Sequence, residues 1–313
     1  MERRAVLVTG AAGGIGKSTV EAFAHDKQFD PIVATDKNDA IHGLFTEDEQ
    51  VLTARVDIRR HEDIKDVIRW MEDDLSGVDI LIQSAGVQNS GSWHSYLDEE
   101  GNPTPELTEM WETNLRGPLW MMQEVLPGMV ERQQGLIFNI TSVSEHNRSP
   151  FRAPYADYKA VLSGVTYRFA SEYGRHGVRI INVQPGMHRT NLDVPRKWTE
   201  RSNQKSASAA QALYDWWRWH IGGNPANVGN TIYDIATGNK NTERIKVSHD
   251  ECAVEGERIF IGWDAHLTSW MDEHVPGWST MLWCGYNLVY GGVKLAQEIN
   301  GKEYWTDQSG NRD

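Results

Sequence analysis

Residues 5–18 of the chain read Ala-Val-Leu-Val-Thr-Gly-Ala-Ala-Gly-Gly-Ile-Gly-Lys-Ser. The short apolar run predicts a buried parallel strand, and the glycine-rich turn after it leads into a helix. Glycines let the backbone N–H groups of such a turn approach a pyrophosphate, and the helix N-terminus adds a favourable dipole. The stretch therefore predicts the first strand–turn–helix unit of an α/β domain that binds a nucleotide.

A P-loop is the main alternative for this turn, because Gly16-Lys17-Ser18 resembles the end of that motif. A P-loop requires a glycine five residues before its last glycine, and the chain has Ala11 at that position. Ala11 therefore argues against a P-loop.

The alternation of short β-branched runs with longer amphipathic segments continues to about residue 185. Helices are predicted at Glu62–Asp74, Glu106–Arg132 and Pro154–Tyr173. Further strands are predicted at Ile32–Ala34, Val51–Val56, Ile80–Ile82, Leu136–Ile140 and Val178–Val183. Alternating strands and helices predict a Rossmann-type, doubly wound parallel sheet. Its ligand site should lie outside the carboxyl ends of the strands.

Bulk composition limits the partners and the location of the protein. The formal net charge is −13, which disfavours nucleic acid and anionic lipid surfaces as partners. Cys252 and Cys284 are too few for a disulfide framework or a zinc cluster, so we expect a reducing, cytoplasmic location. The apolar run near the N-terminus is too short for a signal peptide, and no stretch of about 18 apolar residues predicts a membrane span.

The second predicted strand leads to Asp36, 20 residues after Gly16. A carboxylate there can accept hydrogen bonds from the adenosine ribose hydroxyls, and it repels a 2′-phosphate. The residue before Gly14 is Gly13 rather than a basic side chain, although Lys37 is a nearby cation. We therefore expect NAD(H) as the cofactor rather than NADP(H).

Tyr155 and Lys159 stand four residues apart at the head of a predicted helix. Positions i and i+4 share a helix face, so both side chains can point into one site. A free tyrosine has a pKa near 10, and a neighbouring ammonium group should lower that value by favouring the phenolate. Ser142 lies just past the strand Leu136–Ile140, where its hydroxyl can hydrogen-bond a substrate oxygen.

Several short motifs stand in a fixed order along the chain. They are Thr9-Gly10-x-x-x-Gly14-x-Gly16, Asp57-Ile58, Ala85-Gly86, Asn114, Ser142, Tyr155 with Lys159, and Pro185-Gly186 with Thr190. Over about residues 4–190, this order and spacing resemble the short-chain dehydrogenase/reductase family, in its Tyr-x-x-x-Lys branch. One landmark departs from the family pattern, which usually has Asn-Asn-Ala-Gly where this chain has Gln83-Ser84-Ala85-Gly86.

The resemblance implies a role for each matching residue. Tyr155 acts as general acid/base, and Ser142 orients the reacting oxygen and stabilises its developing charge. Lys159 lowers the tyrosine pKa and holds the nicotinamide ribose, while Asn114 holds a water that links Lys159 to solvent. The other cofactor contacts fall on Gly10, Gly14, Ile15, Gly16, Asp36, Asp57, Ile58, Ala85, Gly86, Pro185, Gly186 and Thr190. No metal is required.

The activity implied is an NAD(H)-dependent oxidoreductase that interconverts a secondary alcohol and a ketone or aldehyde, with dihydrodiols among the open substrate classes. One alternative is a catalytically silent NAD(H)-binding sensor, although such proteins tend to lose the tyrosine. Another is an epimerase or dehydratase on the same fold. That group usually has two residues between its first turn glycines, whereas Gly10 and Gly14 bracket three.

Substrate contacts are expected beside these landmarks. The first candidates are Gln88, Ser144, His146 and Met187, followed by Asn89, Trp93 and His188. In the family, the segment after Pro185-Gly186 folds over the substrate, and here it contains Trp216-Trp217-Arg218-Trp219. These tryptophans either form an apolar wall for a ring-shaped substrate or pack the lid helix or a subunit contact.

We expect a single domain over 1–313. It comprises a cofactor-binding and catalytic core (1–189), a substrate lid region (190–250), and a last strand with a C-terminal tail (251–313). The last strand is predicted at Arg258–Ile261. The resemblance also implies a homodimer or homotetramer that packs through the helices at 106–132 and 154–173.

Overall fold

A computed structural model describes residues 3–91, 93–146, 152–190, 192, 219–220, 222–246 and 255–274 of the chain. Its strands are β1 (Arg4–Thr9), β2 (Phe29–Asp36), β3 (Val51–Arg55), β4 (Ile80–Gln83), β5 (Gly135–Ile140), β6 (Val178–Pro185), β7 (Glu243–Lys246) and β8 (Glu255–Ile261). They form one sheet in the order β3-β2-β1-β4-β5-β6-β8-β7. All neighbouring strands are parallel except β7, which runs antiparallel to β8. The predicted doubly wound parallel sheet is confirmed.

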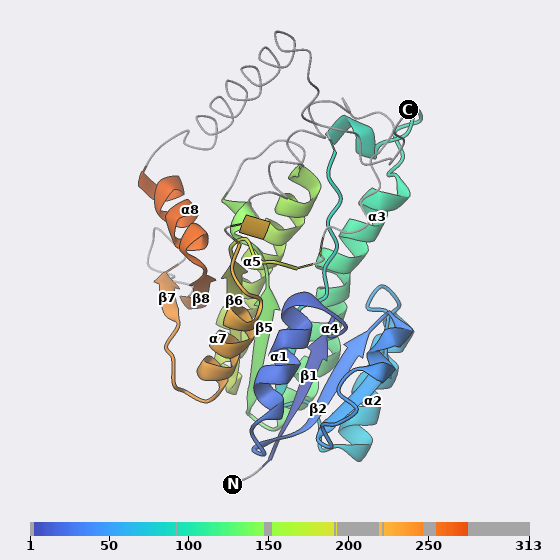
Figure 1. Cartoon of the computed structure of the whole chain (residues 1–313), viewed down its shortest axis with the longest axis vertical. Helices are drawn as coiled ribbons and strands as arrows, with labels where there is room; N and C mark the ends of the chain where they lie inside the picture. The colour runs from blue at the N-terminus through green and yellow to red at the C-terminus, as the bar shows by residue number, and fades with distance from the viewer. Residues whose placement is uncertain are drawn as a thin grey trace.

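Helices cover both faces of the sheet (Figure 1). They are α1 (Gly14–Ala24), α2 (His61–Asp74), α3 (Pro105–Trp111), α4 (Gly117–Glu131), α5 (Ala153–Tyr173), α7 (Ala226–Ala236) and α8 (Trp263–His274). On β1, Val6 and Val8 pack with residues of α1 and α7, whereas Ala5 and Leu7 pack with residues of α2, α4 and α5. Strand β1 is thus apolar on both faces because each face of the sheet has its own core.

The region after β6 holds more regular structure than the sequence predicted. The strand predicted at Arg258–Ile261 is confirmed and begins earlier, at Glu255. Neither β7 nor α7 was predicted, because β7 contains a single apolar residue and polar residues and a glycine interrupt the apolar residues of α7. The buried residues of α7, Val228, Ile232 and Ile235, nevertheless lie on one helix face, against α1.

The helix predicted at Glu106–Arg132 is interrupted in the structure. Between α3 and α4, residues Glu112–Arg116 form a π-helical turn. Such turns widen a helix locally and are frequent at functional sites. This one includes Asn114, which is fully buried and turned toward the carboxyl end of the sheet.

Buried side-chain amides connect α5 to the strands beneath it. Gln83 of β4 donates to Asn139 Oδ1 of β5 at 2.8 Å, and Asn139 donates to Thr166 Oγ1 of α5, also at 2.8 Å. On β6, Asn182 donates to Tyr167 Oη of α5 at 2.7 Å. Buried polar groups must be paired, so these bonds specify how α5 sits on the sheet. Gln83 therefore links β4 to β5 at a position where the sequence departs from the family pattern.

Among the described helices, none is long and apolar enough to cross a membrane. Trp216, Trp217, Cys252, Cys284 and most of the expected lid and tail lie outside the described residues. The predicted boundaries of those parts stay predictions.

Candidate active site

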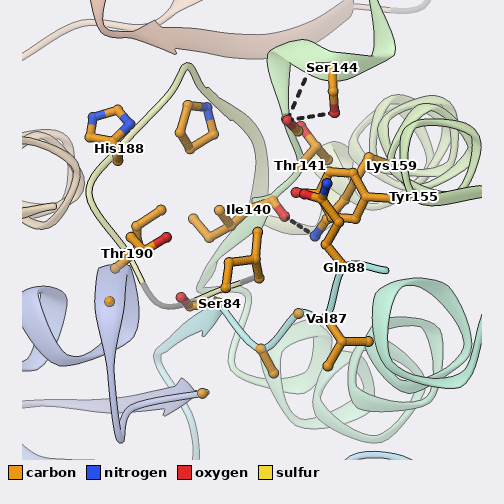
Figure 2. A pocket seen from close by; sticks show the side chains of 18 of the residues that line it. Ser84, Val87, Gln88, Ile140, Thr141, Ser144, Tyr155, Lys159, His188 and Thr190 are labelled. Carbon is orange, nitrogen blue, oxygen red and sulfur yellow. Dashed lines mark hydrogen bonds between the residues drawn. The ribbon is translucent and has the colours of Figure 1, made fainter. Parts of the chain in front are cut away.

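A cavity of about 580 Å³ opens at the carboxyl ends of the parallel strands. Residues just past five strands line it: Gly10 after β1, Lys37 after β2, Ser84 after β4, Thr141 after β5 and Gly186 after β6. The site therefore lies where the doubly wound topology predicts it. In the view of Figure 2, Gln88, Ser144, Tyr155 and Lys159 gather at one side of the cavity, and His188 and Thr190 lie at the other.

The glycine turn is shaped for the close approach of a ligand. Gly10 has φ +69°, and a Cβ on it would lie 2.7 Å from Ala85 Cα, so a side chain is excluded. Gly13 is the N-cap of α1 and has no side chain that could cap the helix. Gly13, Gly14 and Ile15 all line the cavity. The first N–H groups of α1 have no intrahelical acceptors and suit an anion such as a pyrophosphate. Gly16 packs beneath the turn and does not line the cavity.

Carboxylates dominate the end of the cavity at β2. Asp36 accepts backbone hydrogen bonds from Ala12 at 3.1 Å and from Asn38 at 2.9 Å, which fixes its carboxylate at the cavity wall. The neighbouring cation Lys37 is already paired, because its Nζ lies 3.0 Å from Glu109 Oε1. Asp36 therefore faces the cavity with its charge uncompensated by Lys37.

Asp57 and Ile58 line the same end of the cavity. Arg59 forms an ion pair with Asp57 at 2.6 Å and a second with Glu109 at 3.3 Å. Burial alone would raise the pKa of Asp57, but the hydrogen bonds from Arg59 outweigh it and hold this pKa below its usual value. The Arg59 guanidinium therefore pairs with protein carboxylates rather than with a ligand phosphate.

The first turns of α5 place Tyr155 and Lys159 on one helix face, as the spacing predicted. Both are buried, and Lys159 Nζ lies 5.8 Å from the centre of the Tyr155 ring. Lys159 Nζ also donates to the Ile140 carbonyl oxygen at 2.7 Å, as the dashed line in Figure 2 shows. Burial lowers the pKa of Lys159 to about 8, and the attraction of Glu145 opposes that shift.

Ser142 stands directly after β5 and caps a short 3-10 helix. Its Oγ accepts hydrogen bonds from Ser144 N at 3.1 Å and from Ser144 Oγ at 2.7 Å. A hydroxyl has one proton of its own to donate. With both bonds from Ser144 accepted, that proton is left for a partner in the cavity, which Ser142 lines.

Asn114 acts on the loop after β4 rather than on the cavity itself. Its Oδ1 accepts from Val87 N at 3.1 Å, and its Nδ2 donates to Val87 O at 2.8 Å. Val87 and the preceding Ala85 and Gly86 line the cavity, whereas Asn114 does not. The π-helical turn therefore positions Asn114 to fix the loop opposite Lys159.

Most of the expected substrate residues reach the cavity. Gln88, Ser144 and Met187 line it, together with His188, Pro185, Gly186 and Thr190. His146 does not line it; its ring packs 5.9 Å from that of Phe260, and its Nε2 lies 3.3 Å from Gln184 Nε2. Asn89 and Trp93 also lie outside the cavity lining.

Residues 4–201 match a family model described as short chain dehydrogenase. The chain belongs to the short-chain dehydrogenase family. A curated relative, an uncharacterized oxidoreductase of Staphylococcus aureus (strain MRSA252), is 25% identical over 66% of this chain and 87% of its own length.

Solved structures share the fold of this short-chain dehydrogenase. A short-chain dehydrogenase from Streptomyces avermitilis covers 93% of this chain and 99% of its own, with a TM-score of 0.70 and 23% identity. A 4-hydroxyisoleucine dehydrogenase complexed with NADH covers 75% of this chain and 91% of its own, with a TM-score of 0.60 and 25% identity. The protein is thus an oxidoreductase of the short-chain dehydrogenase family.

The structure adds cavity residues of this short-chain dehydrogenase that the sequence analysis missed. They include Arg152, Leu192 and four residues of α8, namely Asp264, Leu267, Thr268 and Met271. Arg152 could have been found, because it stands three residues before Tyr155 at the start of α5. No local signal links α8 to the site, since it follows the last strand of the sheet and reaches the cavity only through tertiary packing.

Proposed function

We propose that the protein is an NAD(H)-dependent oxidoreductase that interconverts a secondary alcohol and a ketone or aldehyde. The observation that carries the proposal is the arrangement of Ser142, Tyr155 and Lys159 on one cavity with the glycine turn of α1. The cavity thus joins a proton-transfer group to a site suited to a pyrophosphate, as an alcohol dehydrogenase requires.

The glycine turn, Asp36, Asp57-Ile58, Ala85-Gly86 and residues 185–190 would hold the dinucleotide, whose nicotinamide ring supplies a hydride acceptor. Oxidation of the alcohol breaks its carbinol C–H bond, and the hydrogen leaves with the electron pair. Tyr155 takes the hydroxyl proton, while Ser142 donates its free proton as a hydrogen bond to the reacting oxygen. Protonated Lys159 favours the phenolate form of Tyr155 and so promotes this proton transfer.

NAD(H) is preferred in the proposal because of the charges around β2. Asp36 presents a carboxylate where the adenosine ribose would lie, and the nearby cations Lys37, Arg55 and Arg59 each form an ion pair with a carboxylate. A 2′-phosphate would meet this negative charge without a free cation to bind it. One solved neighbour is complexed with NADH and another with NADP⁺, which supports a nicotinamide cofactor, and the preference for NAD(H) rests on Asp36.

Asn114 is proposed as a positioning residue, because it holds the Val87 backbone from both sides. The water that the family resemblance assigns to it stays a prediction.

We further propose that the protein forms a homodimer or homotetramer through α3, α4 and α5.

The test is absorbance at 340 nm with a panel of secondary alcohols, diols and sterols, run in parallel with NAD⁺ and NADP⁺. We expect turnover with NAD⁺, and a decrease in kcat of about 100- to 10,000-fold for Tyr155→Phe with NADH binding retained. Tyr158→Phe is the matched control, since Tyr158 lies on α5 outside the cavity lining. NADH binding without turnover of any substrate would favour the sensor, and turnover with NADP⁺ alone would contradict the role of Asp36.

A further inference from the structure

Two side chains that no part of the proposed reaction uses line the cavity beside the catalytic residues. Arg152 is the N-cap residue of α5 and precedes Tyr155 by three positions. Its Nη2 donates to Gln88 Oε1 at 2.6 Å. Gln88 follows Val87, so the loop after β4 and the start of α5 meet at this pair.

The orientation of the Gln88 amide is fixed by its partner. A guanidinium group only donates hydrogen bonds, so the oxygen of the amide must face Arg152 and the NH₂ group must face elsewhere. Gln88 is only 4% exposed, and its Nε2 is buried with no hydrogen-bond partner in the part of the chain that is described. A buried donor without an acceptor is rare in native proteins, and this NH₂ group is suited to an acceptor that a ligand in the cavity can bring.

The charges at this end of the cavity favour an anionic acceptor. The charged side chains that line it there are Arg152 and Lys159, and Lys159 also donates to the Ile140 carbonyl. The acidic lining residues Asp36 and Asp57 lie at the β2 end, and Asp264 accepts from the Met187 N–H. A ligand in this part of the cavity therefore shares it with the cations Arg152 and Lys159 and with Ser142.

We propose that Arg152 and Gln88 bind a carboxylate of the substrate, which makes the substrate a short hydroxy acid or keto acid. A guanidinium beside an amide NH₂ offers adjacent donors to the two oxygens of a carboxylate. Arg152 and Tyr155 line the same cavity at the start of α5, so a carboxylate bound by Arg152 would share that cavity with the carbinol that Tyr155 serves. This inference rests on the proposed function for the chemistry, but the carboxylate site can be tested without turnover.

The binding test uses butyrate and its neutral counterpart butyramide, each titrated into the NADH-saturated full chain by calorimetry. Butyrate should bind more tightly than butyramide. Arg152→Gln should raise the Kd for butyrate by at least about 30-fold, which at 1.4 kcal/mol per tenfold change is about 2 kcal/mol. It should leave the Kd for butyramide unchanged. Arg152→Lys should bind butyrate more tightly than Arg152→Gln does. Gln88→Leu should weaken the binding of butyrate although it removes no charge.

Arg168→Gln is the matched control, because Arg168 lies on the exposed side of α5 and bonds only the Gly164 carbonyl among the described residues. It should bind butyrate as the wild type does. No butyrate binding to the wild type, or equal binding to the wild type and Arg152→Gln, would overturn the carboxylate site.

Turnover then separates this inference from the proposed function. With NAD⁺, 2-hydroxybutyrate and 3-hydroxybutyrate are compared with their methyl esters, and we expect the favoured acid to exceed its ester in kcat/KM. Arg152→Gln should raise KM for the acid and not for the ester. If butyrate binds through Arg152 but no alcohol is oxidised, the proposed function fails and the carboxylate site stands. If Tyr155 is required for turnover but acid and ester react alike, the function stands and the carboxylate site fails.

Discussion

Glu145 carries a largely buried carboxyl group near the catalytic residues, with a side chain that is 11% exposed. Its Oε1 accepts from Ser163 Oγ at 3.0 Å and from the Gln184 side chain, and it lies 3.6 Å from His146 Nε2. Its Oε2 is buried without a hydrogen-bond partner among the described residues. Burial raises the pKa of Glu145 to about 8, although its hydrogen bonds and the charges of Arg258 and Lys159 oppose the shift.

This raised pKa predicts a pH dependence of stability. A group whose pKa is higher in the folded state contributes stability below its unfolded pKa, here 4.5, and that contribution is lost as the pH rises toward about 8. Relative to Glu145→Gln, the wild type should therefore lose free energy of unfolding between pH 5 and 8, by up to about 1.4 kcal/mol per pH unit. Urea unfolding at several pH values measures the difference. Glu172→Gln, on the exposed side of α5, should have the same pH dependence of the free energy of unfolding as the wild type. If the free energies of unfolding of Glu145→Gln and the wild type change with pH in parallel, the prediction is contradicted.

At the scale of elements, α8 connects the last strand to the loop after β6. Asp264, in the first turn of α8, accepts a hydrogen bond from Met187 N, and a Cβ on Gly186 would collide with its carboxylate. Leu267, Thr268 and Met271 extend the same helix along the cavity. The position of α8 thus sets the shape of the loop that is proposed to bind the nicotinamide.

Asp264→Ala should therefore weaken NADH binding. A hydrogen bond to a charged acceptor is worth about 1.5 kcal/mol and 1.4 kcal/mol is a tenfold change, so we expect Kd to rise about 10-fold. The fluorescence of bound NADH measures this change. His274→Ala, at the other end of α8, should bind NADH as the wild type does, and an unchanged Kd for Asp264→Ala would show that α8 does not hold the loop.

The elements that could be predicted from sequence are those whose signals are local. The turn at Gly10–Gly16 and the i, i+4 pair of Tyr155 and Lys159 are encoded within a few residues, and the structure brings both to one cavity. The contribution of α8 and the exclusion of His146 from the cavity depend on where distant segments pack, which a spacing argument does not contain. The π-helical turn was missed because Glu112–Arg116 contains no glycine or proline that would mark a break between α3 and α4.

At the scale of the whole molecule, the outer surfaces of α3 and α5 expose apolar side chains. Trp111 is 40% exposed on α3, and Val161 is 49% exposed on α5. Tyr158 connects the two helices, since its ring packs edge-on against Trp111 at 5.8 Å. Exposed apolar groups on adjacent helices are favourable at a protein interface, where their burial removes them from water.

This surface predicts that the protein associates with a second copy through α3 and α5. Light scattering after size-exclusion chromatography should give a mass that is a multiple of the 35.5 kDa protomer. Val161→Glu should shift the mass toward one protomer, because a symmetric contact would bury two like charges close together. Leu97→Glu is the matched control: Leu97 is 39% exposed in the loop before α3, where it pairs with Pro103 outside both helices, and should leave the mass unchanged. A wild-type mass of 35.5 kDa would contradict the prediction, and an oligomer that survives Val161→Glu would place the interface on another face.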